Sequence, residues 1–214
     1  MPVAAGTPHT LTPRAAAAHA TPVIALIGNP NTGKTTLFNR LCGARAKTSN
    51  FPGTTTTSRV GRAALPGDWL IEIVDLPGLY ELGLDMPETR IARDVLSGTG
   101  LFRQPDAVLV VVDACNLTRN LVLVGELLAF DLPVVVALNM VDLAQRRGLT
   151  INAARVSERL GCPVIPMVAR RGDGVQEVRG ALGGLLSRGL VRQAPADGVP
   201  LSGASIETLT TWAD

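Results

Sequence analysis

Aromatic residues are scarce in this sequence. They make up 3% of its 214 residues, whereas hydrophobic residues of all kinds make up 46%. The core must therefore consist of Val, Leu, Ile and Ala, a composition that suits a parallel sheet covered by helices, because strands buried on both faces read as aliphatic runs.

Long apolar runs are missing too. The longest, 107–112 and 132–141, have the length of strands, whereas a membrane helix needs roughly 18 apolar residues or more, so we expect no direct membrane insertion.

Cysteine is also rare. Cys42, Cys115 and Cys162 form no CxxC pair and show no metal-ligand spacing, which indicates reduced thiols in or near the core of a cytoplasmic protein. The formal net charge is only +2 and the basic residues form no block, so nucleic-acid binding is not expected. The first 21 residues lack the apolar stretch of a secretory signal, which agrees with a cytoplasmic location.

Composition divides the chain into three parts. Residues 1–21 are rich in Ala, Thr and Pro and are interpreted as a flexible leader. Residues 22–188 are interpreted as one ordered domain. Residues 189–214, rich in Ala, Pro, Gly and Ser, are interpreted as a linker that could lead into a further unit.

Within the ordered domain, strand-like aliphatic runs alternate with helical periodicity. We expect strands at 23–27, 59–65, 70–74, 107–112, 134–138 and 164–168, a loop at 45–58, and helices at 33–41, 87–96, 117–130, 151–160 and 175–186. This alternation predicts a three-layer α/β fold, with a mostly parallel six-stranded sheet and helices on both faces. The turn signal at 66–68 predicts one antiparallel edge strand.

A glycine-containing turn follows the first expected strand and precedes the first expected helix. It reads Gly28-Asn29-Pro30-Asn31-Thr32-Gly33-Lys34-Thr35, a complete match to the phosphate-binding loop GxxxxGK[ST] in its required context. Backbone N–H groups and the positive end of the helix dipole converge there on a bound phosphate. Lys34 reaches the outer phosphates, and the Thr35 hydroxyl can ligate Mg²⁺. The sequence therefore predicts a P-loop NTPase fold.

A second motif, Asn139-Met140-Val141-Asp142, follows another buried strand, at the edge of the sheet where ligands bind in such folds. The Asp142 carboxylate can accept two hydrogen bonds from guanine, one from N1–H and one from the exocyclic amine. Adenine has no such donor pair and would leave the carboxylate buried and unpaired, at a cost of roughly 1–3 kcal/mol. The two motifs together predict GTP and GDP as ligands.

A third motif, Asp75-Leu76-Pro77-Gly78, ends the strand expected at 70–74. Asp75 can hold Mg²⁺ through water, opposite Thr35, and Gly78 can offer its N–H to a terminal phosphate. Upstream, the loop has threonines at all four positions 54–57. One of them could complete the Mg²⁺ shell when a terminal phosphate is present, and the residues alone leave the choice open.

In this order and spacing the motifs resemble the translation-factor-related class of small GTPases. Within that class, the sequence resembles the N-terminal G domain of the bacterial ferrous iron transport protein B (FeoB) family, from residue 23 to about residue 187. The stretches that carry the resemblance are GNPNTGKTTLFN at 28–39, NFPG at 50–53, DLPGLY at 75–80 and NMVD at 139–142. The NMVD form discriminates, because most relatives of the class carry Lys at the position of Met140.

The resemblance implies roles for single residues. Thr55 matches the first-switch threonine, and Asn31 matches the asparagine that helps to seat K⁺ in potassium-stimulated GTPases. Leu79 stands where signalling GTPases place a catalytic Gln, and because an aliphatic side chain cannot orient water, slow intrinsic turnover is expected. The implied catalytic residues are Lys34, Asn31, Thr55 and Gly78; nucleotide contacts are implied for the phosphate loop with Thr36 and for Asn139, Met140, Asp142, Val168, Ala169 and Arg170.

The function implied is GTP hydrolysis coupled to bacterial ferrous iron uptake, through a membrane transport domain or a protein partner at the cytoplasmic face of the inner membrane. FeoB proteins continue into a helical spacer, which residues 189–214 could begin. No iron ligands stand out, since His9 and His19 lie in the leader. Two alternatives stay open: a GTP/GDP switch module whose loops 45–58 and 76–86 select a protein partner, and a ribosome- or RNA-associated GTPase, against which the missing basic stripe argues.

Overall fold

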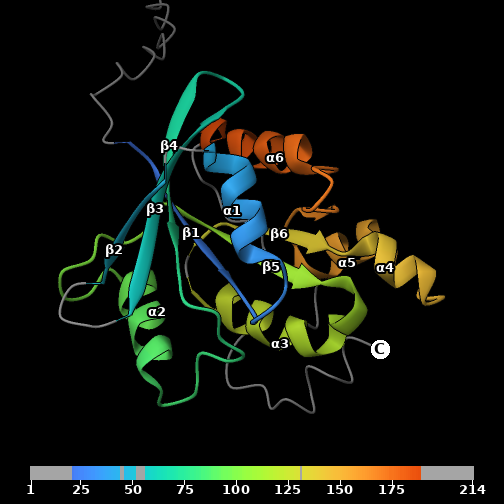
Figure 1. The fold of residues 1–214 in the computed structure, drawn as a ribbon, viewed down its shortest axis with the longest axis horizontal. Coiled ribbons are helices and arrows are strands. Elements are labelled where there is room, and N and C mark those ends of the chain that lie inside the picture. The colour runs from blue at the N-terminus through green and yellow to red at the C-terminus, as the bar shows by residue number, and fades with distance from the viewer. Residues whose placement is uncertain (1–20, 44–45, 52–55, 131, 189–214) are drawn as a thin grey trace, which may run out of the picture.

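The computed structural model describes residues 21–43, 46–51, 56–130 and 132–188. They form one seven-stranded sheet with helices packed against both faces (Figure 1). Of the leader expected at 1–21, only Thr21 is described. The rest of that leader and the linker expected at 189–214 lie outside the described residues.

The elements alternate along the chain much as the sequence predicts. The strands are β1 (Val23–Gly28), β2 (Lys47–Asn50), β3 (Thr57–Leu65), β4 (Trp69–Asp75), β5 (Ala107–Asp113), β6 (Val134–Asn139) and β7 (Val164–Pro166). The helices are α1 (Lys34–Cys42), α2 (Pro87–Ser97), the 3₁₀ turn η2 (Ala114–Asn116), α3 (Leu117–Leu128), α4 (Val141–Arg146), α5 (Ala153–Leu160) and α6 (Val175–Ser187).

The strand order is β2-β3-β4-β1-β5-β6-β7. Strands β4, β1, β5, β6 and β7 run parallel to one another, whereas β3 pairs antiparallel with β4 through the hairpin expected at 66–68. The mostly parallel α/β sheet with an antiparallel edge is therefore confirmed. The sheet has one strand more than the six expected, because β2 adds a further antiparallel strand outside β3.

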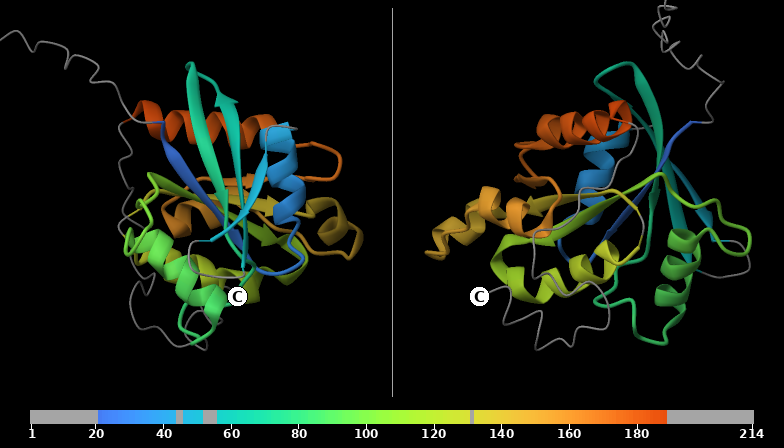
Figure 2. Two further views of the ribbon diagram at one scale, coloured as in Figure 1. Left: turned by 60° about the vertical axis from the view of Figure 1, so that its left-hand side comes forward. Right: turned by 180° about the vertical axis from the view of Figure 1, so that it is seen from behind.

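Side-chain alternation along the central strands builds two cores. In β1, Ile24 and Leu26 face the cluster under α1 and α6, whereas Ala25 and Ile27 face the cluster under α2, α3 and α5. This follows from the period of two along a strand, which sends neighbouring side chains to opposite faces. Figure 2 shows α1 and α6 together on one side of the sheet and α2 and α3 on the other.

Three local differences from the expected elements have physical reasons. Strand β2 falls inside the expected loop at 45–58; its residues Lys47–Asn50 are polar, and the strand shows itself only through its backbone pairing with β3. Helix α4 was not expected, because its six residues are too few to show a helical period. Helix α5 begins at Ala153 instead of 151, since Asn152 caps it by accepting a hydrogen bond from Arg155 N at 3.1 Å.

Within the described parts of the chain, no helix is long and apolar enough to cross a membrane.

Candidate functional site

The turn between β1 and α1 curls tightly at the edge of the sheet. A Cβ at Gly28 would lie 2.5 Å from the carbonyl oxygen of Val111, so only glycine fits there. Gly33 opens α1 in the left-handed region, at φ 89°, which glycine adopts without strain. No side chain caps this helix within the described residues, so its first backbone N–H groups point to where a phosphate would lie.

The inner residues of this turn are fixed by local contacts. The Thr32 hydroxyl donates to the carbonyl oxygen of Asn29 at 2.9 Å. Asn29 is 3% exposed, and its Nδ2 has no hydrogen-bond partner among the described residues. Asn31 is exposed and has a positive φ of 65°, a conformation that asparagine tolerates better than most residues. Pro30 packs beneath Gly78 of the third motif, since a Cβ at Gly78 would lie 3.4 Å from the Pro30 Cα.

Lys34 and Asp75 form an ion pair beside this turn. Lys34 Nζ donates to Asp75 Oδ1, and the two side chains are 13% and 8% exposed. The pair forms because β4 lies parallel to β1, with Asp75 level with Leu26, which brings the end of β4 next to the start of α1. The cationic group expected to reach the phosphates and the acid expected to serve Mg²⁺ are therefore neighbours, with the exposed Thr35 next along α1.

Asn139 joins three segments of the site. Its Nδ2 donates to the carbonyl oxygen of Thr32 at 2.8 Å, and its Oδ1 accepts from Ala169 N at 2.9 Å. An amide is suited to this position because it offers a donor and an acceptor in one side chain. At 3% exposed, Asn139 fixes the phosphate loop and the 168–170 loop relative to β6.

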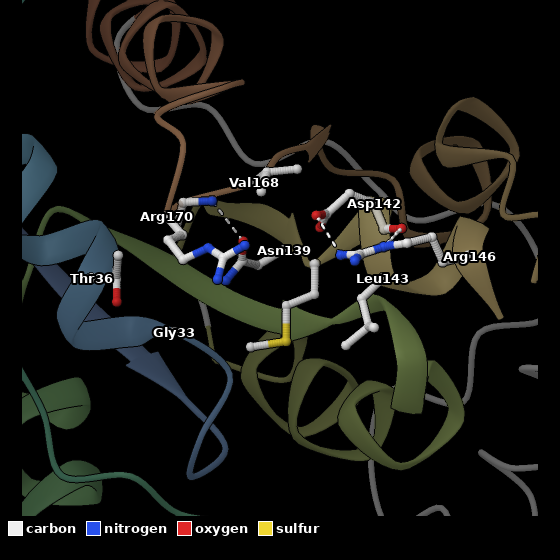
Figure 3. A pocket seen from close by; sticks show the side chains of 10 residues that line it. Gly33, Thr36, Asn139, Asp142, Leu143, Arg146, Val168 and Arg170 are labelled. Atoms are coloured by element: carbon white, nitrogen blue, oxygen red, sulfur yellow. Dashed lines mark hydrogen bonds and ion pairs between the residues drawn. The ribbon is translucent and has the colours of Figure 1, made fainter.

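A cavity of about 430 Å³ opens beside Asn139, as Figure 3 shows. Its wall is made by the phosphate loop, the start of α4 and the loop after β7: Gly33, Thr36, Asn139, Met140, Asp142, Leu143, Arg146, Val168, Ala169 and Arg170. Eight of these ten residues are among those expected from the sequence to contact the nucleotide; the other two are Leu143 and Arg146. A pocket of this size, with a carboxylate at one side, can hold a purine base.

Asp142 is the carboxylate of this cavity. Met140 adopts a left-handed conformation, φ 63°, which turns the chain sharply from β6 into α4 and places Asp142 in the first turn of that helix. Asp142 Oδ2 lies 3.0 Å from Arg146 Nη2 and 3.8 Å from Arg171 Nη1. Two guanidinium groups thus approach the group expected to bind guanine, and Figure 3 shows Arg146 extended alongside Asp142.

The 168–170 loop is closed by its own backbone. Val168 N donates to the carbonyl oxygen of Asp173 at 3.0 Å, and Gly172 N donates back to the Val168 carbonyl oxygen at 3.0 Å. Arg40, from α1, donates to the carbonyl oxygen of Arg170 at 2.5 Å. The loop is therefore attached to both β6, through Asn139, and the phosphate-binding helix.

The first-switch loop is described only at its ends. Thr55, expected to complete the Mg²⁺ shell, lies outside the described residues. Phe51 is 3% exposed, packs edge-on against Phe102 with ring centroids 5.9 Å apart, and donates its N–H to the carbonyl oxygen of Thr56 at 2.9 Å. The loop thus begins and ends at the closed end of the β2–β3 hairpin.

Several contributing residues were not singled out from the sequence. Arg146 stands four residues after Asp142 on one helix, a spacing that could have suggested their contact. Arg40 and Arg171 gave no such signal, because their contacts depend on how distant segments pack.

No group of three or more His, Cys, Asp or Glu side chains that could hold a metal occurs within residues 21–43, 46–51, 56–130 and 132–188.

Comparison with known proteins places the chain in a family. The model of the family described as ferrous iron transport protein B matches residues 22–182. The Fe(2+) transporter FeoB of Salmonella typhimurium is 43% identical over 159 residues, and that of Escherichia coli K12 is 42% identical over the same length. Each match covers 74% of this chain and 20% of the relative, so the chain spans about one fifth of the length of the curated relatives it matches.

Solved structures agree with the sequence matches. An S. thermophilus NFeoB mutant bound to mGDP is 40% identical, with a TM-score of 0.69 over 76% of this chain and 60% of that one. The cytosolic domain of L. pneumophila FeoB is 39% identical, with a TM-score of 0.71 over 82% and 67%. The cytosolic domain of T. maritima FeoB in its GMPPNP form is 32% identical, with a TM-score of 0.74 over 81% and 67%.

Proposed function

The chain belongs to the ferrous iron transport protein B family, of which it carries the N-terminal G domain, and we propose that it binds GTP and GDP and hydrolyses GTP. The observation that carries the proposal is the position of Asn139. Its two hydrogen bonds hold the phosphate loop and the 168–170 loop around one cavity, with Asp142 at the side of that cavity. Related FeoB domains with 32–40% identity have been solved with mGDP and in a GMPPNP form.

Guanine would be recognised by Asp142 and the backbone of the 168–170 loop. Asp142 has a side chain 19% exposed, at the cavity wall, where both carboxylate oxygens can face a base. The guanine N1–H and exocyclic amine supply the two donors, and backbone N–H groups near Ala169 can donate to the guanine carbonyl. Adenine lacks this donor pair, so the carboxylate would lose its partners on binding ATP.

Phosphates would bind the first turn of α1 and Lys34. In this structure Lys34 is paired with Asp75. We infer that the ammonium group exchanges Asp75 for the outer phosphates when a nucleotide binds, which frees the carboxylate. The fixed backbone N–H groups and Lys34 then stabilise the negative charge that shifts between the phosphoryl oxygens in the transition state.

The residues present fit a Mg²⁺ ion that bridges protein and phosphates. Thr35 offers a hydroxyl and Asp75 a carboxylate, the hard oxygen donors that Mg²⁺ prefers, and Mg²⁺ commonly keeps waters and phosphate oxygens as its other ligands. Thr55 is proposed as a further ligand in the GTP state. Thr35 and Asp75 would hold the ion, which would supply positive charge to offset that of the phosphates.

We also propose that GTP hydrolysis by this chain is intrinsically slow and is stimulated by potassium. Asn31 is exposed on the phosphate loop, at a positive φ, so its side chain is accessible to a monovalent cation. Leu79, at the position of the catalytic Gln of signalling GTPases, is 5% exposed and packs into the core. It cannot orient water, so the attacking water has to be placed by backbone groups, and slow intrinsic hydrolysis follows.

At the level of the cell, we propose that hydrolysis is coupled to bacterial ferrous iron uptake, through a membrane transport domain or a protein partner at the cytoplasmic face of the inner membrane. The relatives of Salmonella typhimurium and Escherichia coli are named Fe(2+) transporters, which supports this coupling. Ferrous iron uptake by cells in which the native gene carries Lys34→Ala should then be lost, whereas Lys47→Ala, on the exposed face of β2, should leave uptake unchanged.

Nucleotide binding is tested by two variants of the purified chain. Lys34→Ala should weaken binding of fluorescent GDP by about tenfold or more, while Lys47→Ala serves as the charge-matched control. Asp142→Asn should weaken GDP and favour xanthosine diphosphate, because Asn can donate to the carbonyl that xanthine carries in place of the guanine amine. An unchanged preference for GDP over ADP and xanthosine diphosphate in Asp142→Asn would overturn the assignment of the base site.

A further inference from the structure

Helix α3 holds the segment that follows Gly78. Glu126, on α3, accepts a hydrogen bond from Leu82 N to Oε2 at 2.6 Å and one from Gly83 N to Oε1 at 3.3 Å. Both carboxylate oxygens are therefore engaged by consecutive backbone N–H groups of the segment. Hydrogen bonds to an ionised acceptor are shorter and roughly twice as strong as those between neutral groups.

The same segment is attached at its other end to β1 and the phosphate loop. Leu76 N donates to the carbonyl oxygen of Leu26 at 2.9 Å, and Leu79 N donates to that of Gly28 at 3.3 Å. Gly78 lies between these attachments, against Pro30. The backbone from 76 to 83 is thus fixed to the phosphate loop upstream and to α3 downstream.

Side chains of the segment also dock on the α3 side. Leu79 and Leu82 are each 5% exposed and belong to the core cluster that contains Leu123 and Leu127 of α3. Tyr80 is 40% exposed, and the guanidinium carbon of Arg119, on α3, lies 4.2 Å from the centroid of its ring. Arg119 and Glu126 are about two helical turns apart, so one face of α3 contacts the segment at two points.

The surroundings of Glu126 oppose its charge, and the N–H groups of the segment partly offset that opposition. Burial is the largest influence and raises the pKa of Glu126, and the nearby Glu81 raises it as well. The N–H groups of Leu82 and Gly83, and the positive charge of Arg93, lower this pKa. Glu126 is therefore a half-buried carboxylate whose charge is stabilised by the N–H groups of Leu82 and Gly83, unlike a surface acid that water solvates.

We propose that Glu126 is a positioning residue for GTP hydrolysis: it holds residues 79–83 on α3 and thereby fixes the backbone of Gly78 beside the phosphate loop. The inference rests on the proposed GTP hydrolysis, in which the Gly78 N–H binds the terminal phosphate. A fixed N–H donor needs no reordering as charge develops on that phosphate. GDP lacks the γ-phosphate that this N–H would bind, so the affinity for GDP does not depend on this attachment.

The test compares Glu126→Gln with Glu81→Gln, which removes the same charge from a neighbouring acid on the segment. Gln has one carbonyl acceptor, and its amide N–H₂ would face the second backbone donor, so one hydrogen bond is lost without a change of size. In Glu126→Gln, amide hydrogen exchange of residues 79–83 should be about tenfold faster, and kcat for GTP about tenfold lower. GDP affinity should stay within about twofold of wild type, and Glu81→Gln should resemble wild type in all three measurements.

Each other outcome identifies what has failed. Unchanged amide exchange at 79–83 in Glu126→Gln would overturn the attachment itself. Faster exchange with unchanged kcat, or an equal loss of GDP and GTP affinity, would show a structural role only and overturn the positioning role. If wild type does not hydrolyse GTP, the proposed function fails, while hydrogen exchange still reports whether Glu126 holds the segment.

Discussion

At the scale of single residues, the carboxylate proposed to bind guanine already has a partner. Arg146 Nη2 lies 3.0 Å from Asp142 Oδ2, and the Arg146 side chain is 65% exposed. Exposed ion pairs contribute about 0.2–1 kcal/mol, and the contact must be given up when a guanine donor takes Oδ2. We therefore expect Arg146→Ala to tighten GDP binding by about two- to fivefold, measured by fluorescence titration at low salt.

Arg147 provides the matched control for this prediction. It is the next residue along the chain, is exposed, and carries the same charge. Arg147→Ala should leave GDP affinity unchanged. Weaker GDP binding in Arg146→Ala would instead mean that Arg146 supports Asp142 while guanine is bound.

The cysteines give a second prediction at this scale. Burial raises the pKa of Cys42 to about 11 and that of Cys162 to about 12; it also raises the pKa of Cys115, which is only partly buried. Because the thiolate is the reactive form, iodoacetamide at pH 8 should label Cys115 first, and all three only after unfolding. Labelling of Cys42 as fast as Cys115, read by mass spectrometry, would contradict the packing of α1 described above.

The sequence predicts the residue types of the site better than their contacts. Lys34, Asp75 and Asp142 could be placed because each belongs to a motif at the carboxyl end of a strand. The partners of Asn139 could not, because Thr32 and Ala169 are 107 and 30 residues away along the chain and meet it only through the packing of the sheet. The contacts of Glu126 could not be predicted from the sequence for the same reason, since its partners are 44 and 43 residues away along the chain.

At the scale of elements, the turn that opens α1 depends on Gly33. Its φ is 89°, and a Cβ added there would overlap Asn139 Nδ2. Gly33→Ala would therefore displace the amide that joins the two loops, and we expect GDP binding to fall by at least about tenfold, since one buried hydrogen bond is worth roughly 1–3 kcal/mol when its partner is left unpaired. Isothermal titration calorimetry would measure the loss.

Gly148 is the control for backbone strain. It has a similar φ of 76°, but an added Cβ would meet nothing within 4 Å among the described residues. Gly148→Ala should lower the melting temperature through the cost of a positive φ, about 1–2 kcal/mol, without a change in GDP affinity. Equal losses of affinity in both variants would show that strain, and not the contact with Asn139, decides the effect.

Elements with a strong apolar pattern were predictable, and those without one were not. The central strands β5 and β6 are aliphatic throughout and buried, so their runs identify them. Strand β2 is polar and is defined by its hydrogen bonds to β3, and the six residues of α4 follow from the turn at Met140. Both depend on backbone pairing or turn geometry, which residue periodicity does not report.

At the scale of the whole molecule, the motifs of the proposed nucleotide site lie together at one edge of the sheet. The ends of β1, β4 and β6 carry the phosphate loop, Asp75 and Asn139, and the two cores on either face of the sheet hold these ends in register. Helices α1 and α6 pack on one face of the sheet, while α3 packs on the other face and contacts the segment after Gly78. A change of nucleotide state would therefore reach α3 through residues 76–83.

The central claim is that this arrangement hydrolyses GTP, and hydrolysis by the purified chain tests it most directly. Phosphate release should be measured with GTP and with ATP, in potassium and in sodium chloride at matched ionic strength with Mg²⁺ present. We predict turnover with GTP alone, slow in sodium and clearly faster in potassium. Equal turnover of ATP, or tight GTP binding with no turnover in either salt, would contradict the account.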